Sequence, residues 1–206
     1  MKKYLKAFLF LACISSVAFA QEGKSFGIQF GLDQGGMTGF TGYTSTGINI
    51  TGGIFKQWMK KNKKNQPSYG LEMQLIYSSY TMGKSVDITQ PTSSFSISVY
   101  SVPVLFKINL ASTHAVLPKD KNDEKKGSYF QFRGIYLFGG PIAGYLTTNA
   151  SGPGELTPFF GGGMGGIQVW LGNAKFEISA YKSLTKIYKG YDNAVNGVAG
   201  SIGFAF

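Results

Sequence analysis

Cysteine and histidine are nearly absent from this sequence of 206 residues, which holds one of each, Cys13 and His114. So few thiol and imidazole groups exclude a disulfide framework, a thiolate metal site and thiol catalysis, once Cys13 leaves with the N-terminal segment described below. The carboxylates show no EF-hand-like spacing, so we expect no metal site and no cofactor. We also expect no enzymatic activity, because His114 falls in a predicted turn and catalysis needs a positioned partner network.

Long apolar runs are missing as well. Beyond residue 20 no stretch of 18 apolar residues occurs, whereas a membrane-spanning helix needs roughly 20. The first 20 residues combine a lysine-rich start, an apolar segment at 7–17 and the small-residue motif Ala18-Phe19-Ala20. This is the anatomy of a secretory signal peptide, and it predicts cleavage between Ala20 and Gln21. We therefore expect a signal peptide at residues 1–20 and one domain at residues 21–206.

Cys13 allows a second interpretation of this segment, a lipoprotein signal that is cleaved before the cysteine. The preceding residues, Phe10-Leu11-Ala12, fit a lipoprotein site poorly, and the apolar stretch continues to the better site at Ala20. Cleavage after Ala20 would leave the mature chain without cysteine.

Acidic residues are scarce: 10 Asp and Glu stand against 20 Lys and Arg, for a net charge of +10. A basic balance raises the possibility of a nucleic-acid ligand. The predicted export signal argues against it, and many of the lysines occur in runs such as 60–64 and 119–126, which are typical of solvated turns. We therefore expect no nucleic-acid partner.

Glycine and aromatic residues are abundant, with 29 Gly, 17 Phe and 12 Tyr. Helices do not tolerate so much glycine, and disordered glycine-rich chains lack so many aromatics. Apolar residues alternate with small or polar ones, as in residues 25–33 and 198–206. The alternation predicts eight strands, at 24–33, 47–59, 69–81, 94–110, 129–147, 158–171, 175–187 and 196–206.

Two of these strands need more than simple alternation. In 129–147 one face carries the large apolar residues and is expected to point outward: Phe130, Phe132, Tyr136, Phe138, Ile142 and Leu146. In 94–110 the apolar residues change parity, from Ile97 and Val99 to Val104 and Phe106. A β-bulge near Ser101 would restore one apolar face.

Aromatic residues gather at the predicted strand ends. One set is Trp58, Tyr69, Tyr129, Trp170, Phe176 and Phe206, and the opposite set is Tyr77, Tyr80, Phe95, Tyr145, Phe159 and Tyr188. Two aromatic girdles bordering an apolar band are typical of a membrane barrel, in which every strand must pair on both sides. We predict an all-β fold, an eight-stranded antiparallel up-and-down transmembrane β-barrel. A soluble periplasmic lipocalin-like barrel that binds an apolar ligand is the alternative, and a lipid-modifying barrel enzyme is the third.

The final residues, V-x-G-x-I-x-F-x-F from 198 to 206, resemble the C-terminal signature of bacterial outer-membrane barrels. That resemblance implies that Ile202, Phe204 and Phe206 form the signal that the barrel-assembly machinery recognises. The segments 102–108, 138–146 and 161–187 resemble the PorT-like small outer-membrane barrel family. The resemblance implies a Gram-negative outer membrane as the location and its lipid as a partner, with a surface or periplasmic protein as a further possible partner.

Four charged residues have the parity of the barrel lumen: Glu72, Lys107, Arg133 and Glu177. They could form a selectivity element, but eight strands enclose only enough room for side chains. We therefore predict that they pair and plug the lumen. The function expected from the sequence is a non-enzymatic structural or surface-binding role in the cell envelope. Periplasmic turns are expected at 60–68, 111–128 and 172–174, and surface loops at 34–46, 82–93, 148–157 and 188–195.

Overall fold

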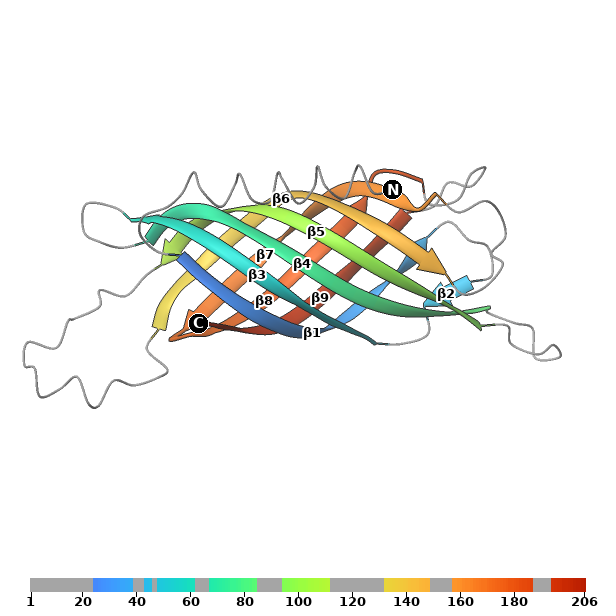
Figure 1. Cartoon of the computed structure of the whole chain (residues 1–206), viewed down its shortest axis with the longest axis horizontal. Coiled ribbons are helices and arrows are strands. Elements are labelled where there is room, and N and C mark those ends of the chain that lie inside the picture. Colours follow the sequence, from blue (N-terminus) through green and yellow to red (C-terminus); the bar gives the residue numbers. More distant parts are fainter. Residues whose placement is uncertain are drawn as a thin grey trace, which may run out of the picture.

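The computed structural model describes residues 24–38, 43–45, 48–61, 67–84, 94–111, 132–148, 157–186 and 194–206. Within these ranges the chain forms antiparallel strands (Figure 1). They are β1 (Lys24–Thr38), β2 (Tyr43–Ser45), β3 (Asn49–Lys61), β4 (Pro67–Lys84), β5 (Ser94–Ala111), β6 (Phe132–Thr148), β7 (Phe159–Leu171), β8 (Ala174–Ser183) and β9 (Ala194–Ala205). None of the described residues belongs to a helix long and apolar enough to span a membrane.

The sheet closes into a barrel of eight long strands. Each long strand pairs antiparallel with its neighbours along the chain, and β1 pairs with β9 to complete the ring. The short β2 pairs with β4 beyond the end of β3 and so lengthens that side of the barrel. Closure leaves no free sheet edge along the eight strands. The predicted eight-stranded antiparallel up-and-down barrel is confirmed.

The two chain ends of the barrel meet at one end, which we call the terminal end. There the backbone N–H of Phe206 donates to the carbonyl of Phe26 at 2.8 Å. β7 and β8 are joined at the same end by a two-residue turn at 172–173, where Gly172 has a φ of 57°. A left-handed backbone favours glycine at this position. The opposite end of the barrel is called the loop end. Figure 1 shows the terminal end at the left.

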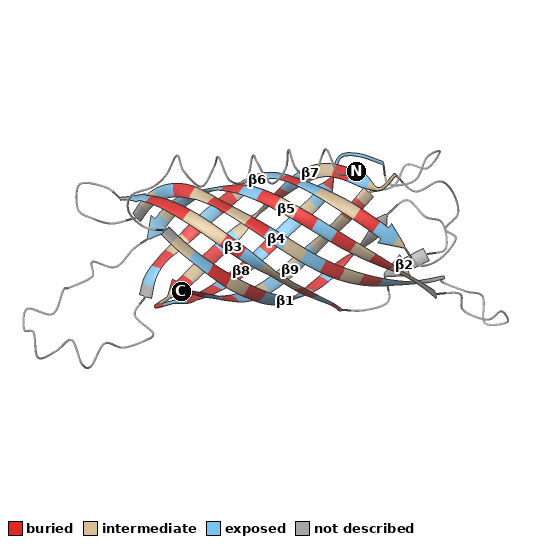
Figure 2. Ribbon diagram, in the orientation of Figure 1, coloured by how far each residue is buried: buried red, intermediate tan, exposed pale blue. Residues whose placement is uncertain are grey.

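Buried and exposed residues alternate along the strands (Figure 2). The outer face is largely apolar, whereas the lumen contains both apolar and polar side chains. Towards the loop end lies an apolar cluster of Tyr80, Ile97, Val99, Leu105, Phe138, Ile142, Leu146, Phe160, Met164 and Val195. A second cluster lies nearer the terminal end and contains Phe55, Met59, Tyr136, Trp170 and Ala205.

The outward face predicted for β6 is wrong. Tyr136, Phe138, Ile142 and Leu146 are all buried in the lumen, while Leu137 is exposed on the outside. Both faces of this strand are apolar, because the lumen itself holds an apolar cluster. Hydrophobicity alone therefore could not tell the two faces apart.

The bulge predicted near Ser101 is also wrong, because the face of β5 that points into the lumen is apolar as well. Ile97 and Val99 point into the lumen and Val104 and Phe106 point out, so their opposite parity belongs to one regular strand. Pairing with β4 keeps one register across Ser101, from Val104 opposite Met73 to Ser101 opposite Ile76. Register shifts occur elsewhere, between Lys60 and Lys61, Asn109 and Ala111, and Phe132 and Gly134.

Two adjacent glycines of β7 give a test of this packing. A Cβ added at Gly162 would collide with the backbone carbonyl of Lys182 on β8, whereas one added at Gly163 meets nothing within 4 Å. Gly162→Ala should therefore lower the free energy of unfolding in detergent micelles by about 1–3 kcal/mol. Gly163→Ala is the matched control and should stay within about 0.5 kcal/mol of wild type. Equal losses in the two variants would contradict the placement of β7 against β8.

Candidate functional site in the barrel lumen

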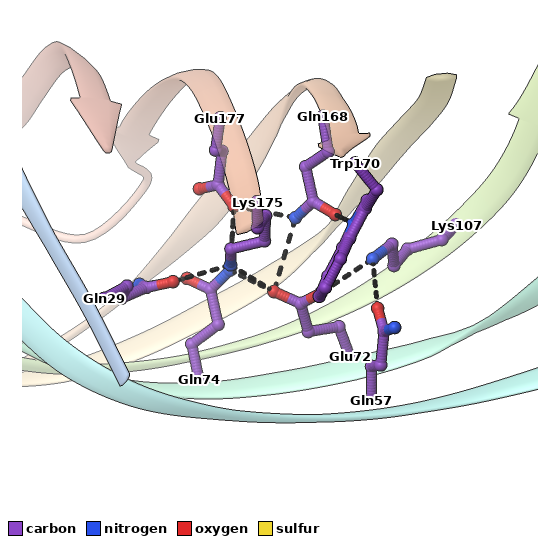
Figure 3. Close-up of polar contacts among 9 residues, drawn as sticks. All are labelled: Gln29, Gln57, Glu72, Gln74, Lys107, Gln168, Trp170, Lys175 and Glu177. Carbon is purple, nitrogen blue, oxygen red and sulfur yellow. Dashed lines mark hydrogen bonds and ion pairs between the residues drawn. The ribbon is translucent and has the colours of Figure 1, made fainter. Parts of the chain in front are cut away.

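Charged and amide side chains form a network across the lumen (Figure 3). The network lies towards the terminal end, because Glu72 is in the first third of β4 and Lys175 is at the start of β8. Two strands each direct two residues of the network inward, at alternate positions: Glu72 and Gln74 on β4, Lys175 and Glu177 on β8. β5 contributes Lys107. Single glutamines come from β1, β3 and β7, namely Gln29, Gln57 and Gln168.

Glu72 is at the centre of this network. Its Oε2 accepts from the Lys107 ammonium at 2.7 Å, and its Oε1 accepts from the Lys175 ammonium at 2.9 Å. The Oε1 atom also accepts from the amides of Gln74 at 2.6 Å and Gln168 at 3.3 Å. The carboxylate is thus surrounded by two cations and two neutral donors, which compensate for its removal from water.

Lys175 connects Glu72 to the second carboxylate. Its Nζ donates to Gln29 at 2.6 Å, to Glu72 at 2.9 Å and to Oε2 of Glu177 at 3.2 Å. An ammonium has three donors, and each of these has an acceptor. Oε2 of Glu177 also accepts from Gln168 at 2.7 Å.

Lys107 is held on the other side of Glu72. Its Nζ donates to Oε1 of Gln57 at 2.7 Å, and it lies over the rings of Tyr136 and Trp170 at 5.1 and 5.4 Å. Lys175 lies 4.1 Å from the ring centroid of Phe55. Both ammoniums therefore make cation–π contacts with the aromatic cluster near the terminal end, in addition to their ion pairs with carboxylates.

The network spans the full width of the barrel. In the ring of strands, β4 and β8 lie opposite each other, four steps apart in either direction. The contact from Glu72 to Lys175 therefore crosses the lumen directly. Glu72, Lys107 and Lys175 are each 0% exposed. Two carboxylates and two ammoniums balance in charge.

A second contact crosses the lumen nearer the loop end. Asp33 on β1 accepts from the Tyr80 hydroxyl at 2.6 Å and from the Tyr181 hydroxyl at 2.8 Å, both on Oδ2. The two hydroxyl oxygens lie 2.9 Å apart and belong to the opposed strands β4 and β8. We call these three residues the Asp33 triad.

The structure brings together three of the four charges expected in the lumen, Glu72, Lys107 and Glu177. Arg133 does not belong to the set: its side chain is exposed, because β6 presents the opposite face to the lumen. Its place is taken by Lys175. The parity of Glu177 could have revealed Lys175, since the two residues lie two positions apart on one strand.

Other residues singled out in the sequence lie elsewhere. Ile202, Phe204 and Phe206 point outward from the last strand, with Phe206 79% exposed. Ala18, Ala20, Gln21 and His114 lie outside the described residues. Within the ranges that the structure describes, no group of three or more His, Cys, Asp or Glu side chains is arranged to hold a metal ion.

Comparison with known proteins found no matching family model and no matching curated protein. Among solved structures, the chain is similar to the outer membrane protein OprG of Pseudomonas aeruginosa, with 12% identity and a TM-score of 0.47 over 89% of this chain and 94% of that one. The outer membrane protein Ail of Yersinia pestis gives 14% identity and a TM-score of 0.41 over 89% and 100% of the two chains. The translocator domain of the autotransporter NalP of Neisseria meningitidis gives 11% identity and a TM-score of 0.37 over 100% and 96%. The fold assignment rests on the strand pairing itself.

Neutralising Glu72 tests the energetic weight of the network. Glu72→Gln leaves two buried ammoniums facing one carboxylate, and breaking a buried ion pair in this way typically costs about 3–5 kcal/mol. We expect a loss of that order in urea unfolding in micelles, followed by tryptophan fluorescence. Glu72→Gln combined with Lys107→Gln restores the charge balance and should recover part of the loss.

The exposed Arg133 supplies the control for this series. Arg133→Gln should change stability by less than about 0.5 kcal/mol, since exposed side chains without buried partners contribute little. A full loss in Arg133→Gln, or no recovery in the double variant, would contradict the network as described.

Proposed function

We propose that the chain is a non-enzymatic outer-membrane β-barrel protein with a structural or surface-binding role in the cell envelope, and that its lumen is plugged rather than open. The direct contact between Glu72 and Lys175 across the full width of the barrel carries this proposal. The remaining support comes from the outer face, the aromatic residues and the last strand.

The outer face has the polarity that a lipid environment requires. Large apolar side chains lie exposed on every long strand, among them Phe30, Ile54, Leu75, Val104, Leu137, Ile167, Ile178 and Phe204. Among the outward charged side chains, Lys60, Arg133 and Lys182 lie near strand ends. Lys56 lies near the middle of β3, opposite Phe26 close to the start of β1. A closed barrel satisfies its backbone hydrogen bonds internally, which is the condition for crossing lipid.

Exposed aromatic residues border this apolar band. Tyr69, Phe176 and Phe206 lie towards the terminal end, and Tyr77, Tyr100 and Phe159 towards the loop end. Aromatic girdles at both interfaces are typical of membrane barrels. Two of the aromatics first assigned to the girdles, Tyr80 and Trp170, instead point into the lumen.

The width of the barrel and the pairing of charges inside it support the proposed plug. Eight strands leave an interior that side chains fill, and here carboxylates, ammoniums and amides from six strands hydrogen-bond to one another in one region. Opening a path for ions would separate charges whose partners have replaced water, which is costly.

A soluble lipocalin-like barrel fits these observations less well, because such a barrel turns its apolar face inward and its polar face to water. Phe138, which the sequence placed outside, no longer supports this argument, but exposed residues such as Phe30 and Ile178 do. A lipid-modifying enzyme would depend on His114, which lies outside the described residues. The outward row of Ile202, Phe204 and Phe206 suits recognition by the barrel-assembly machinery. Membership of the PorT-like family, and a surface or periplasmic protein partner, stay predictions.

The membrane location can be tested by fractionation. The protein should sediment with the outer membrane, and in detergent gels its mobility should change on boiling, because a closed barrel resists unfolding until heated. Outer-membrane and periplasmic marker proteins serve as controls for the fractions. Recovery in the soluble periplasmic fraction would refute the proposal and favour the lipocalin-like alternative.

The plug can be tested in planar bilayers. Purified protein should insert and show little ionic current, because a path for ions would have to separate the paired charges of the network. Glu72→Gln should conduct more than wild type where it inserts equally well, since it unbalances the network. A large and steady wild-type conductance would show an open lumen and overturn the plug while leaving the barrel intact.

A further inference from the structure

A cavity lies in the lumen between the charged network and the Asp33 triad. Its walls include Asp33, Tyr80 and Tyr181 on one side and Gln29 and Glu177 on the other. It leaves about 40 Å³ for the centres of water molecules, which is room for a few waters or one small ion. Side-chain hydroxyls form part of the remaining wall, from Thr51, Ser78, Ser101, Ser179 and Ser201. The rest of the wall is apolar, from Ile76, Val99, Ile142, Phe160, Met164, Val195 and Ala199.

The charges around this cavity do not balance. Glu72 and Glu177 are offset by Lys107 and Lys175. Asp33 adds a third carboxylate, is 2% exposed, and has no cationic partner among the residues that the structure describes. The described part of the lumen therefore has one negative charge in excess, located at the wall of the cavity.

The hydrogen bonds of Asp33 favour its ionised form. The Tyr80 and Tyr181 hydroxyls both lie within donating distance of Oδ2. A tyrosine hydroxyl has one proton to donate, and a carboxylate is an acceptor only, so two donated bonds satisfy the charged group.

Two further oxygens at the cavity wall have no donor from the described residues. All the hydrogen bonds that reach the Glu177 carboxylate end on Oε2, which leaves Oε1 unengaged. The hydroxyl oxygen of Ser201 is buried and makes no hydrogen bond. Of these two oxygens, the Ser201 hydroxyl is buried without a partner. Such a group is costly, and a ligand or water in the cavity would relieve that cost.

We propose that this cavity binds one small monovalent cation, of the size of Na⁺ or K⁺, with Asp33 as its charged ligand and the Glu177 and Ser201 oxygens as further ligands. One positive charge neutralises the excess, and oxygen ligands suit hard cations of this kind. The site rests on the proposed function in that it needs the closed barrel, with the charged network limiting it on the terminal side.

The dependence of thermal stability on the type of salt tests the site. A ligand that binds only the folded barrel raises the unfolding midpoint, by about 2–4 °C when its concentration is about five times its dissociation constant. We expect the wild-type midpoint in micelles to be higher in NaCl or KCl than in choline chloride at equal concentration, since choline is too large for the cavity. Asp33→Asn should abolish this difference, and Lys182→Gln, an outward change near the loop end, should retain it.

Ser201→Ala separates a cation site from an empty or water-filled cavity. With a bound cation, the variant loses part of the difference between sodium and choline salts. With no cation, removal of an unpaired buried hydroxyl raises stability equally in all salts.

Equal wild-type midpoints in the three salts would overturn the proposal. Mobility before and after boiling is recorded in each salt. A folded barrel without a cation effect refutes only the cation site, whereas a protein that forms no heat-modifiable barrel refutes the proposed function.

Discussion

Closure of eight strands into one ring is the constraint on which the rest of the structure depends. It satisfies the backbone along every long strand and sets a lumen so narrow that a side chain on β4 can touch one on β8. A charged group that points into such a space gives up its water and must find partners on other strands. The pairing of Glu72 with Lys107 and Lys175, and of both lysines with glutamines, follows from this width.

The sequence predicted the strands and their closure into a barrel. It predicted which face points outward for some strands but not for others. In β1 and β9 each apolar residue is flanked by polar or small ones, and β4 alternates in the same way from Tyr69 to Leu75. The outer face of Phe26, Leu75 and Phe204 was therefore clear from alternation. In β5 and β6 that contrast is missing, because apolar residues such as Ile97 and Ile142 fill the lumen near the loop end. The assumption that the more apolar face meets lipid then fails. It inverted β6, placed the exposed Arg133 in the lumen and made a regular β5 seem bulged.

The ionic network was predictable in part. Glu72, Lys107 and Glu177 were recognisable because the other face of each strand meets an apolar environment. A charged residue in the middle of such a strand is therefore expected to point into the lumen. Lys175 has the same parity but stands next to the β7–β8 turn, where lysine is ordinarily solvated. The Asp33 triad could not be predicted from the sequence, because it joins residues of β1, β4 and β8 that lie at the same depth in the lumen. That depth depends on the register of every strand between them.

Polar residues in the lumen also fix that register. A one-residue slip of a strand exchanges its two faces. For β6, with Leu137 outside and Phe138 inside, such a slip exchanges one apolar face for another. For β4 it would move Glu72 from its two ammoniums to the apolar outer face, and for β8 it would do the same to Lys175 and Glu177. The cost of an unpaired charge in an apolar environment therefore falls on β4 and β8, which face each other across the lumen, and also on β5 and β1, which carry Lys107 and Asp33. With these strands held by their buried charges, an apolar strand such as β6 has only to follow its neighbours' hydrogen bonds.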